Sequence, residues 1–269
     1  MNFQSHFNMS RNFRLQTVVL VGSGNVAGHL AKAFRQEGLR ILQIYSPDMS
    51  HARALAAKVD AEAINSYPAM NMQADFYLLT VRDVKIASVA EQMPQVDGVV
   101  CHTSGITPME ILDRFEYYGV FYPFQTFSKN RDMDISQVPF CLEASSEETY
   151  GALRALAGKL SSAVYGIDTE RRMKLHLAAV LVNNFTNHLY AETEDFLKEN
   201  GLEMEMLLPL IRETVAKIEK LPATEAQTGP ARRGDMSTIA RHLEMLKNKD
   251  DLKEIYQIFS QQILKKYHE

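Results

Sequence analysis

The chain has 269 residues, of which 46% are hydrophobic and 23% are charged. This mixture is typical of a globular protein and excludes a mainly disordered chain. The 29 basic and 33 acidic residues give a net charge of −4, so no basic excess exists for a dedicated nucleic-acid-binding protein. The length indicates about two domains.

Residues 1–14 are polar and lack the apolar core of a signal peptide, so we interpret them as a flexible extension. No run of about 18 apolar residues occurs, which argues against a membrane-spanning helix. The two cysteines are too few for a disulfide framework and are consistent with a reducing compartment. These features predict a cytoplasmic protein with no membrane partner. The histidines show no metal-ligand spacing, so no metal site is predicted.

The first part of the chain alternates short apolar strands with helical patterns. The expected strands are Thr17–Val21, Arg40–Tyr45, Ala61–Ile64, Asp75–Val81, Gly98–His102, Gly119–Tyr122, Val138–Leu142 and Ala163–Gly166. The expected helices are Ala27–Phe34, Ser50–Lys58, Val84–Gln92, Pro108–Tyr117 and Ser146–Leu160. This alternation predicts a Rossmann-type α/β fold with a doubly wound, mainly parallel sheet. A nucleotide is then expected in a crevice at the carboxyl ends of the strands.

After Asp168 the strand pattern ends, so we expect a Rossmann domain at 15–168 and an all-α C-terminal domain at 169–269. The expected helices are Thr169–Asn200, Leu202–Leu221, Met236–Leu246 and Asp250–Lys266, with a loop at Pro222–Asp235. Pro209 requires a kink or a break in the second of these helices. The helical part carries more Met, Leu and Phe than a short bundle needs, which predicts a homodimer through this domain.

The most specific motif is a glycine-rich turn after the first strand. Its residues follow the pattern of a dinucleotide-binding turn: Gly22, Ser23, Gly24, Asn25, Val26 and Ala27. Gly22 permits the tight turn, Gly24 lets the backbone approach a pyrophosphate, and Ala27 permits close packing of helix on strand. The helix that begins here directs free N–H groups at the phosphates. The alternative is a strand–turn–helix without a ligand.

The end of the second strand bears on the choice of dinucleotide. NAD-preferring sites place a carboxylate about 20 residues after the glycines, whereas this chain has Tyr45 and Ser46 there. A hydroxyl at Ser46 accepts a 2′-phosphate and Arg53 supplies positive charge nearby, which favours NADP(H) over NAD(H). Arg53 also fits a solvated helix position. Tyr45 is included among the cofactor residues.

The ends of two later strands should face the same crevice. Thr80 and Val81 close the fourth strand, and His102 closes the fifth, so we assign all three to the cofactor site. His102 has an alternative interpretation as a strand-end histidine satisfied by backbone groups. Ser104 and Gly105 follow, where they leave room for a nicotinamide or substrate and supply a hydroxyl.

Polar residues on the first long helix form a second group of candidates. His176, Asn183 and Asn187 fall at i, i+7 and i+11, which places them on one face at 100° per residue. Polar groups on a buried helix must be paired or serve a ligand, so the strip indicates either a site or a domain or subunit interface. Lys174 lies on a different face of this helix.

A rigid, charged loop, Thr228–Asp235, completes the candidates. Its adjacent Arg232 and Arg233 are suited to grip a substrate carboxylate, because arginine binds carboxylates in bidentate fashion. An ion pair across a subunit interface is the competing interpretation. Asp235 is expected to cap the following helix.

Together these motifs resemble one bacterial family. The resemblance rests on His102–Gly105, Tyr122–Phe127, the helix with Lys174, His176 and Asn183, and Thr228–Asp235. The family joins a Rossmann-like NADP-binding domain to a C-terminal helical domain of unknown function. It is related to pyrroline-5-carboxylate reductases and 6-phosphogluconate-dehydrogenase-like proteins. The resemblance implies the fold, the dinucleotide site and a dimer through the helical domain. The family commonly has His-Pro where this chain has Tyr122-Pro123.

Two functions of different classes follow. The first is an NADP(H)-dependent oxidoreductase that passes a hydride to or from a small carboxylate-bearing carbonyl, imine or alcohol. His176 would exchange the proton, while Ser104 and Asn183 orient the reacting oxygen and Lys174 completes the catalytic candidates. Substrate contacts would come from Ser104, Gly105, Asn187, Arg232 and Arg233. The second is a non-catalytic NADP(H)-binding sensor or partner-binding protein, which the absent family histidine favours.

Overall fold

The computed structural model describes residues 14–129 and 131–269. The predicted extension at 1–14 therefore lies outside the described residues, except for its last residue. The chain divides into two compact units, Met1–Ala179 and Val180–Glu269, which we call the α/β unit and the helical unit and describe separately. This division falls later in the chain than the boundary predicted at Asp168. In the described ranges, none of the helices is long and apolar enough to cross a membrane.

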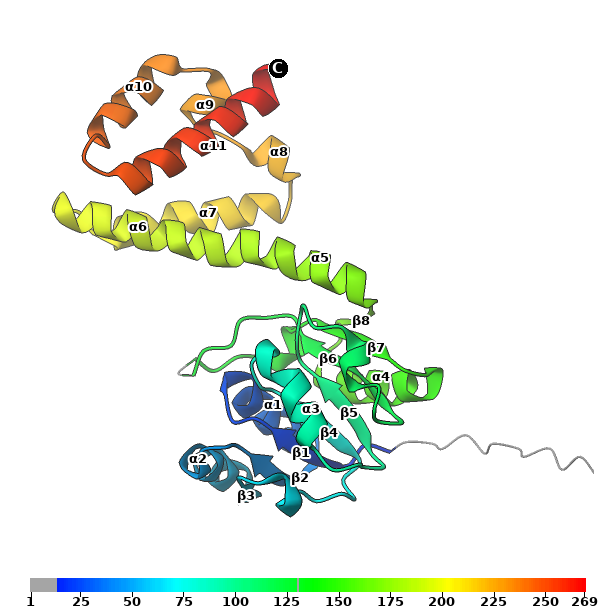
Figure 1. The fold of residues 1–269 in the computed structure, drawn as a ribbon. Helices are drawn as coiled ribbons and strands as arrows, with labels where there is room; N and C mark the ends of the chain where they lie inside the picture. Colours follow the sequence, from blue (N-terminus) through cyan, green and yellow to red (C-terminus); the bar gives the residue numbers. More distant parts are fainter. Residues whose placement is uncertain (1–13, 130) are drawn as a thin grey trace, which may run out of the picture. The chain divides into compact units, whose positions relative to one another are not determined.

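The α/β unit is built on one eight-stranded sheet (Figure 1). The strands are β1 (Thr17–Val21), β2 (Arg40–Tyr45), β3 (Glu62–Ile64), β4 (Phe76–Leu79), β5 (Val99–His102), β6 (Tyr118–Pro123), β7 (Phe140–Ala144) and β8 (Val164–Gly166). Their order is β3-β2-β1-β4-β5-β6-β7-β8, and every pair is parallel except β6 with β7. The first six strands have the Rossmann order, with the switch point between β1 and β4. The predicted fold class is confirmed.

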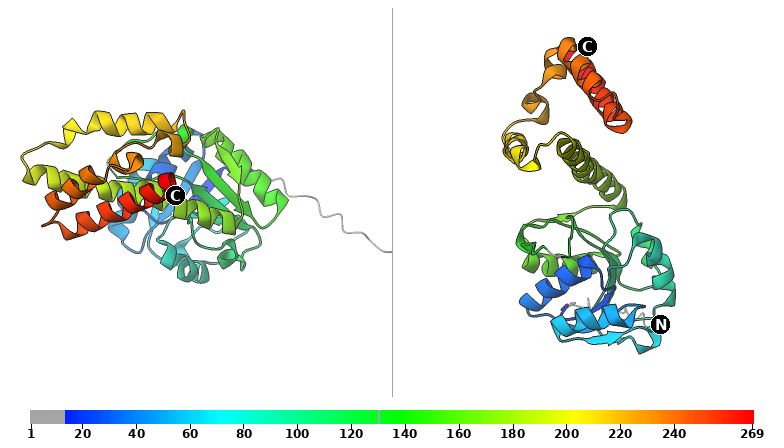
Figure 2. Two further views of the ribbon diagram at one scale, coloured as in Figure 1. Left: turned by 90° about the horizontal axis from the view of Figure 1, so that it is seen from above. Right: turned by 90° about the vertical axis from the view of Figure 1, so that its left-hand side faces the viewer.

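Both faces of the sheet are covered, which explains why its strands are apolar throughout. In β1, Val18 and Leu20 belong to one buried cluster, and Val19 and Val21 belong to another on the opposite face. The helices are α1 (Asn25–Gln36), α2 (Met49–Val59), α3 (Ile86–Gln92) and α4 (Glu147–Leu160). The first cluster includes side chains of α1, α2 and α4, and the second includes those of α3. Figure 2 shows helices on both sides of the sheet.

One predicted helix is wrong. Pro108–Tyr117 forms only a short 3-10 turn, η3 (Met109–Leu112), whose N–H groups bond three residues back. Leu112 and Phe115 are buried and attach this segment to the sheet within a single turn, after which the chain enters β6. Tertiary packing therefore overrides the local preference. The helix predicted to begin at Val84 likewise begins later, after a 3-10 turn, η2 (Asp83–Lys85).

The long helix predicted at Thr169–Asn200 is interrupted by a π-helical segment. It consists of α5 (Thr169–Ala179), η5 (Val180–Phe185) and α6 (Thr186–Glu199). A π-helix has i→i+5 hydrogen bonds and turns less per residue than an α-helix. The 100° step used for Asn183 and Asn187 therefore does not apply through η5, and their predicted alignment with His176 does not follow. The predicted stop is confirmed, since Gly201 has a φ of +69°.

The rest of the helical unit contains three short helices and three longer ones. They are η6 (Met204–Met206), α7 (Leu208–Ile218), α8 (Ala223–Ala226), α9 (Pro230–Arg233), α10 (Met236–Met245) and α11 (Asp250–His268). Pro209 lies in the first turn of α7, where a missing N–H costs nothing, so it begins the helix instead of kinking it. The loop predicted at Pro222–Asp235 contains α8 and α9. Gly229 and Gly234, both with positive φ, bracket α9.

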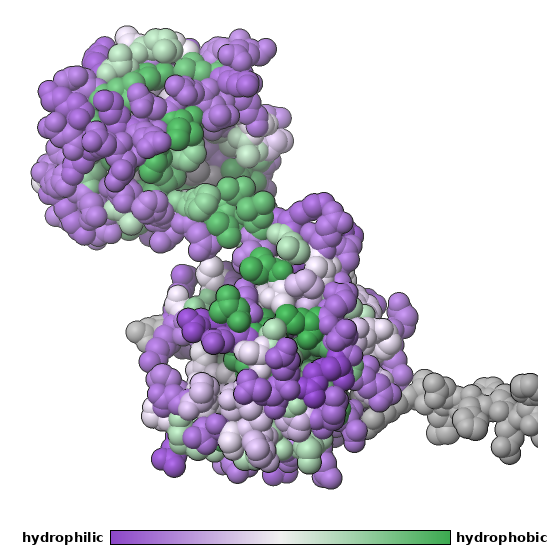
Figure 3. Space-filling view, in the orientation of Figure 1, coloured by the Kyte–Doolittle hydropathy of each residue, from purple (hydrophilic) through white to green (hydrophobic). Residues whose placement is uncertain are grey.

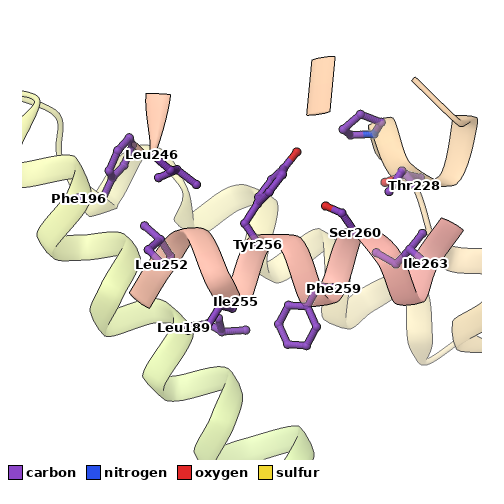
Figure 4. A pocket seen from close by; sticks show the side chains of 12 residues that line it. Leu189, Phe196, Thr228, Leu246, Leu252, Ile255, Tyr256, Phe259, Ser260 and Ile263 are labelled. Atoms are coloured by element: carbon purple, nitrogen blue, oxygen red, sulfur yellow. The ribbon is translucent and has the colours of Figure 1, made fainter. Parts of the chain in front are cut away.

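The core of the helical unit is thin. Among residues 180–269, all of which the structure describes, the buried hydrophobic side chains are Leu197, Ala231, Ile239 and Leu246. Beside them lies an apolar pocket of about 310 Å³ between α6, α9, α10 and α11. Figure 4 shows side chains of α6 and α11 around it, with the Tyr256 and Ser260 hydroxyls as polar groups. This unit therefore leaves much of its apolar surface uncovered.

Candidate functional site

The glycine-rich turn between β1 and α1 has the geometry that a dinucleotide requires. Gly22 has a φ of +127°, and a Cβ there would lie 2.5 Å from Thr80 Oγ1, so only glycine fits. Gly24 precedes the first residue of α1 with no side-chain cap on the helix, and a Cβ on it would meet no atom within 4 Å. Ala27 is fully buried. The first turn of α1 thus keeps its N–H groups available beside open space, which suits a pyrophosphate.

The carboxyl ends of β1, β4 and β5 lie side by side in the sheet, next to the glycine-rich turn. The Thr80 N–H donates to Val21 O at 2.9 Å, and the Thr103 N–H donates to Leu79 O at 3.2 Å. The ladder of the sheet therefore continues one step past β4 and past β5. Thr80 also donates from Oγ1 to Val21 O at 3.3 Å, and Val81 next to it is partly buried. The predicted residues Thr80 and Val81 thus occupy the switch-point edge, next to the glycine turn.

The end of β2 holds the residues proposed to select the dinucleotide. Tyr45 is buried and stacks on Tyr67 with ring centroids 4.7 Å apart. The backbone N–H of Ser46 donates to Ile64 O at 3.1 Å, and the residue is largely buried. Asp48 caps α2 by accepting from the Ser50 N–H at 2.8 Å, and hydrogen bonds from Ser50 lower the pKa of this carboxyl. Arg53 is exposed on α2.

His102, at the end of β5, has its side chain engaged by the protein. The residue is 0% exposed. Its Nδ1 accepts from the Ser104 N–H at 3.1 Å, and its Nε2 faces Pro108 O at 3.4 Å. Burial, followed by the charge of Arg172, lowers the pKa of His102 to about 4, so the ring is neutral. The predicted contact of its side chain with a cofactor does not fit this burial. The alternative, a strand-end histidine satisfied by backbone groups, describes it.

Three residues from different elements lie together beyond the carboxyl ends of β5 and β6. They are Gly105 in the loop after β5, Tyr122 near the end of β6 and His176 on α5, and we call them the Gly105 cluster. The Tyr122 hydroxyl lies 3.1 Å from His176 Nδ1. A Cβ on Gly105 would lie 2.5 Å from His176 Nδ1 and 2.9 Å from the Tyr122 hydroxyl. Burial, with a smaller contribution from nearby Cys141, raises the pKa of Tyr122 to about 12, so this hydroxyl keeps its proton at neutral pH.

Ser104 shapes the loop that carries Gly105. Its hydroxyl accepts from the N–H groups of Ile106 at 3.2 Å and Thr107 at 3.0 Å, which closes a tight turn. The residue is 3% exposed. Its acceptor capacity is therefore used within the loop. Lys174, on the first turns of α5, is exposed and pairs with Glu170 one turn earlier.

The remaining predicted residues belong to the helical unit. Asn183 and Asn187 are exposed on η5 and α6. Arg232 places its guanidinium 4.2 Å from the ring centroid of Tyr267, and Arg233 is exposed. The capping role of Asp235 is confirmed, since its carboxylate accepts from the Thr238 N–H at 3.1 Å.

Three features were missed at the sequence level. Tyr122 was identified only as a departure from the family pattern, although its place at a strand end was a usable signal. Arg172 is completely buried and bonds to the Ser104 carbonyl at 2.8 Å, whereas its sequence context reads as a solvated helix. The loop after β6 lies on α1, where the Asn25 amide donates to Phe127 O at 2.9 Å. Only the folded chain brings that loop to the start of α1, next to the glycine-rich turn.

The fold and the glycine turn define a Rossmann-type dinucleotide-binding protein with a C-terminal helical unit. A family model described as NADP oxidoreductase coenzyme F420-dependent matches residues 17–101. A second, a domain of unknown function (DUF2520), matches residues 138–263. No curated protein sequence matches the chain.

Solved structures extend this assignment. A Bacteroides fragilis protein described as a candidate NADP oxidoreductase is 41% identical, with 93% of this chain and 98% of that chain covered and a TM-score of 0.86. A Thermotoga maritima protein is 23% identical, covers 91% and 96%, and has a TM-score of 0.69. Pyrroline-5-carboxylate reductase from Streptococcus pyogenes shares the fold at 15% identity, with coverage of 93% and 98% and a TM-score of 0.60.

The identity to the Bacteroides protein extends over almost all of both chains. The chain therefore belongs to the family of NADP oxidoreductases that join a Rossmann-like domain to this C-terminal domain of unknown function.

Proposed function

We propose that the protein is an NADP(H)-dependent oxidoreductase acting on a small carboxylate-bearing carbonyl, imine or alcohol. The observation that carries the proposal is the Gly105 cluster, which lies at the same sheet edge as the glycine turn. A bound nicotinamide supplies or accepts the hydride. The chain must then orient the two reactants and move one proton. Pyrroline-5-carboxylate, named for one protein of the same fold, is a carboxylate-bearing imine and supports this substrate class.

The Gly105 cluster is suited to moving the proton. With its raised pKa, Tyr122 stays protonated, and its hydroxyl lies at hydrogen-bond distance from Nδ1 of His176. The hydroxyl can donate to Nδ1 or accept from it, so the contact orients the imidazole in either protonation state; a protonated ring would give the hydrogen on Nε2 to the reacting oxygen or nitrogen while Nδ1 keeps its own. Among the described residues, Nε2 of His176 has no hydrogen-bond partner, so it is available to a reacting oxygen or nitrogen. The absent side chain at Gly105 leaves the space that the imidazole occupies.

The preference for NADP(H) over NAD(H) rests on the end of β2. The first side chain past the strand is the hydroxyl of Ser46, and the nearest carboxylate, Asp48, is engaged as the cap of α2. Ser46 carries no charge where NAD-preferring sites place a carboxylate, so a 2′-phosphate would not be repelled at that position. Arg53, which is exposed on α2, remains a candidate for balancing the charge of the 2′-phosphate.

A second candidate function is binding without turnover. The Ser104 hydroxyl already accepts two backbone N–H groups, and Nδ1 of His176 already pairs with Tyr122. Groups so engaged are what a redox sensor or a partner-binding subunit would show. The same contacts also describe a preorganised catalytic site, so activity separates the two candidates.

The experiment is a titration with NADPH and NADH, followed by a turnover screen of keto acids and cyclic imines with the tighter cofactor. We expect NADPH to bind at least tenfold more tightly. His176→Ala and Gly105→Ala should reduce turnover at least a hundredfold without weakening cofactor binding, because neither residue lies on the glycine turn. Gly151→Ala is the matched control, since a Cβ there meets no atom within 4 Å. Turnover that survives both substitutions would contradict the catalytic role of the cluster.

We also propose a homodimer through the helical unit. Large apolar side chains are exposed across it, including Leu181, Val182, Phe185, Leu210 and Met245. Figure 3 shows apolar residues gathered on the surface of this unit. A soluble monomer rarely exposes so much apolar surface. We favour a second copy of the chain as the partner, because the thin core of the unit leaves these apolar side chains uncovered. Asn183, Asn187, Arg232 and Arg233 then remain candidates for either the substrate or the subunit contact.

A further inference from the structure

We infer that Arg172 is a positioning residue for the proposed reaction: it holds the loop Ser104–Thr107 against α5 so that Gly105 packs under His176. The inference rests on the proposed function for its catalytic consequence, but not for its geometry. Arg172 lies one helical turn before His176 on α5, within the α/β unit. It is among the largest fully buried side chains there, and the residue is 0% exposed.

The guanidinium joins the loop to the start of the helix with its two terminal nitrogens. Nη1 donates to Ser104 O at 2.8 Å and to Thr107 O at 3.0 Å. Nη2 donates to Glu143 Oε2 at 3.1 Å and to Thr169 Oγ1 at 2.9 Å. One planar group therefore ties two carbonyls of the loop to β7 and to the first residue of α5. The fixed fork of arginine suits this task, and the single ammonium of lysine does not.

The acid partner is itself fixed. Glu143 lies near the end of β7, and its Oε1 accepts from the Thr169 N–H at 2.9 Å. Its Oε2 accepts from the Thr169 hydroxyl at 2.8 Å. The carboxylate thus satisfies the start of α5 and neutralises Arg172 at the same time. A buried charge is tolerated when it is paired and hydrogen-bonded in this way.

The loop needs this anchor because the packing above it is tight. The hypothetical Cβ on Gly105 would already lie 2.5 Å from the imidazole, so little free space separates the loop from His176. Ser104 closes the turn internally, but its hydrogen bonds to Ile106 and Thr107 do not attach the turn to α5. Among the described residues, the bonds from Arg172 are the side-chain hydrogen bonds that join this loop to α5. A displacement of about 1 Å at such a site is enough to reduce catalysis strongly.

Arg172 acts through its neighbours and not on the substrate. It is completely buried, and its Nε has no hydrogen-bond partner in the described part of the chain. It forms no hydrogen bond to Tyr122 or His176 among the described contacts. Its charge also disfavours protonation of His102, which keeps the histidine available as an acceptor for the Ser104 N–H. Both effects stabilise one conformation of the loop.

The test compares Arg172→Lys with Arg171→Lys, the exposed neighbour on the same helix. Hydrogen exchange should accelerate at least tenfold in the segment 103–108 of Arg172→Lys and stay unchanged in β1 and α1. Protein labelled with ¹³C-histidine should show the His176 signal shifted as it is in Tyr122→Phe. The kcat of Arg172→Lys should fall at least tenfold while its KM for NADPH stays within twofold. Arg171→Lys should match the wild type in every measurement.

The outcomes separate this inference from the proposed function. Wild-type exchange at 103–108 and an unshifted His176 signal in folded Arg172→Lys would overturn the positioning role, whatever the turnover. If both change while the wild type turns over none of the screened substrates, the positioning role stands and the proposed function fails. Should Arg172→Lys not fold, Thr169→Ala replaces it, because that variant removes one anchor of the guanidinium and keeps the ion pair. A folded Thr169→Ala with wild-type exchange and His176 signal would overturn the inference as well.

Discussion

Replacing Gly24 with valine tests the dinucleotide site without disturbing the fold that carries it. Gly24 has a φ of −78° and a ψ of −169°, which is extended backbone that a β-branched residue prefers. A Cβ there meets no protein atom within 4 Å. The isopropyl group would therefore fill only the open space beside the first turn of α1. If a pyrophosphate binds in that space, the valine side chain displaces it.

The expected loss follows from the hydrogen bonds that the phosphates would make. A hydrogen bond to a charged group contributes about 1.5–3 kcal/mol. Losing one such bond weakens binding by about tenfold to a hundredfold, at about 1.4 kcal/mol per factor of ten. Folding should change little. Valine is a poorer helix cap than glycine, but it reduces the entropy of the unfolded chain, and the two effects offset one another to within about 1 kcal/mol.

The assay is calorimetric or fluorescence titration with NADPH, beside urea unfolding of the free protein. Gly28→Ala is the matched control, because Gly28 lies one turn further along α1 and a Cβ on it also meets no atom within 4 Å. We expect unchanged NADPH affinity in this control. Its free energy of unfolding should rise by about 0.4–1 kcal/mol.

A Gly24→Val protein that folds normally and binds NADPH within twofold of the wild type would refute the reasoning. In that case the first turn of α1 does not hold the phosphates, and the assignment of Ser23, Asn25 and Val26 to the cofactor fails with it. A wild-type protein that binds neither NADPH nor NADH would refute the dinucleotide proposal itself.

Three further predictions concern stability and assembly. Burial raises the pKa of Tyr122 to about 12, above its unfolded value, so its contribution is complete below about pH 10 and is lost as the pH rises towards 12. The fall in unfolding free energy over that range should become shallower in Tyr122→Phe, by up to about 1.4 kcal/mol per pH unit. Burial and Arg172 lower the pKa of His102 to about 4, so its stabilising contribution is present above about pH 6.5 and is lost as the pH falls towards 4. The acid loss of up to about 3 kcal/mol should be absent from His102→Gln, and an unchanged acid slope in urea unfolding would contradict this assignment. Leu210 is 63% exposed on α7, so Leu210→Glu should convert a dimer to a monomer in sedimentation, whereas the control Glu213→Gln should not, and a monomeric wild type would end the dimer proposal.

The sheet was predictable because its signal is local. Each strand is a short apolar run bounded by turn residues, and a strand covered on both faces has no other pattern to adopt. The segment Pro108–Tyr117 and the helix at Thr169–Asn200 were predicted less well. In the first, Leu112 and Phe115 complete the packing within one turn. In the helix at Thr169–Asn200, the hydrophobic pattern remains helical while the hydrogen bonding in η5 changes from i+4 to i+5. No single residue type predicts such a change.

Some parts of the candidate site were likewise predictable from the sequence, and others were not. The glycine turn was predictable because its chemistry lies in consecutive residues whose backbone geometry only small residues allow. The Gly105 cluster was only partly predictable, since Gly105, Tyr122 and His176 come from three separate elements that the fold brings together. Arg172 was not predictable at all. An arginine beside another arginine on a helix normally faces solvent, and its burial depends on Glu143, which reaches it from a different strand.

The tyrosine that replaces the family histidine therefore does not by itself leave the site without acid–base groups. A histidine at position 122 would place a second imidazole beside that of His176. Tyr122 instead presents one hydroxyl that keeps its proton, because burial raises its pKa to about 12. Its contact with Nδ1 leaves Nε2 of His176 free for the proton exchange that we propose. Tyr122→His should then retain turnover with an altered pH profile, whereas Tyr122→Phe should lower kcat, because it removes the bond that orients the imidazole. A Tyr122→Phe protein with the kcat and pH profile of the wild type would show that the Tyr122 hydroxyl has no part in the reaction.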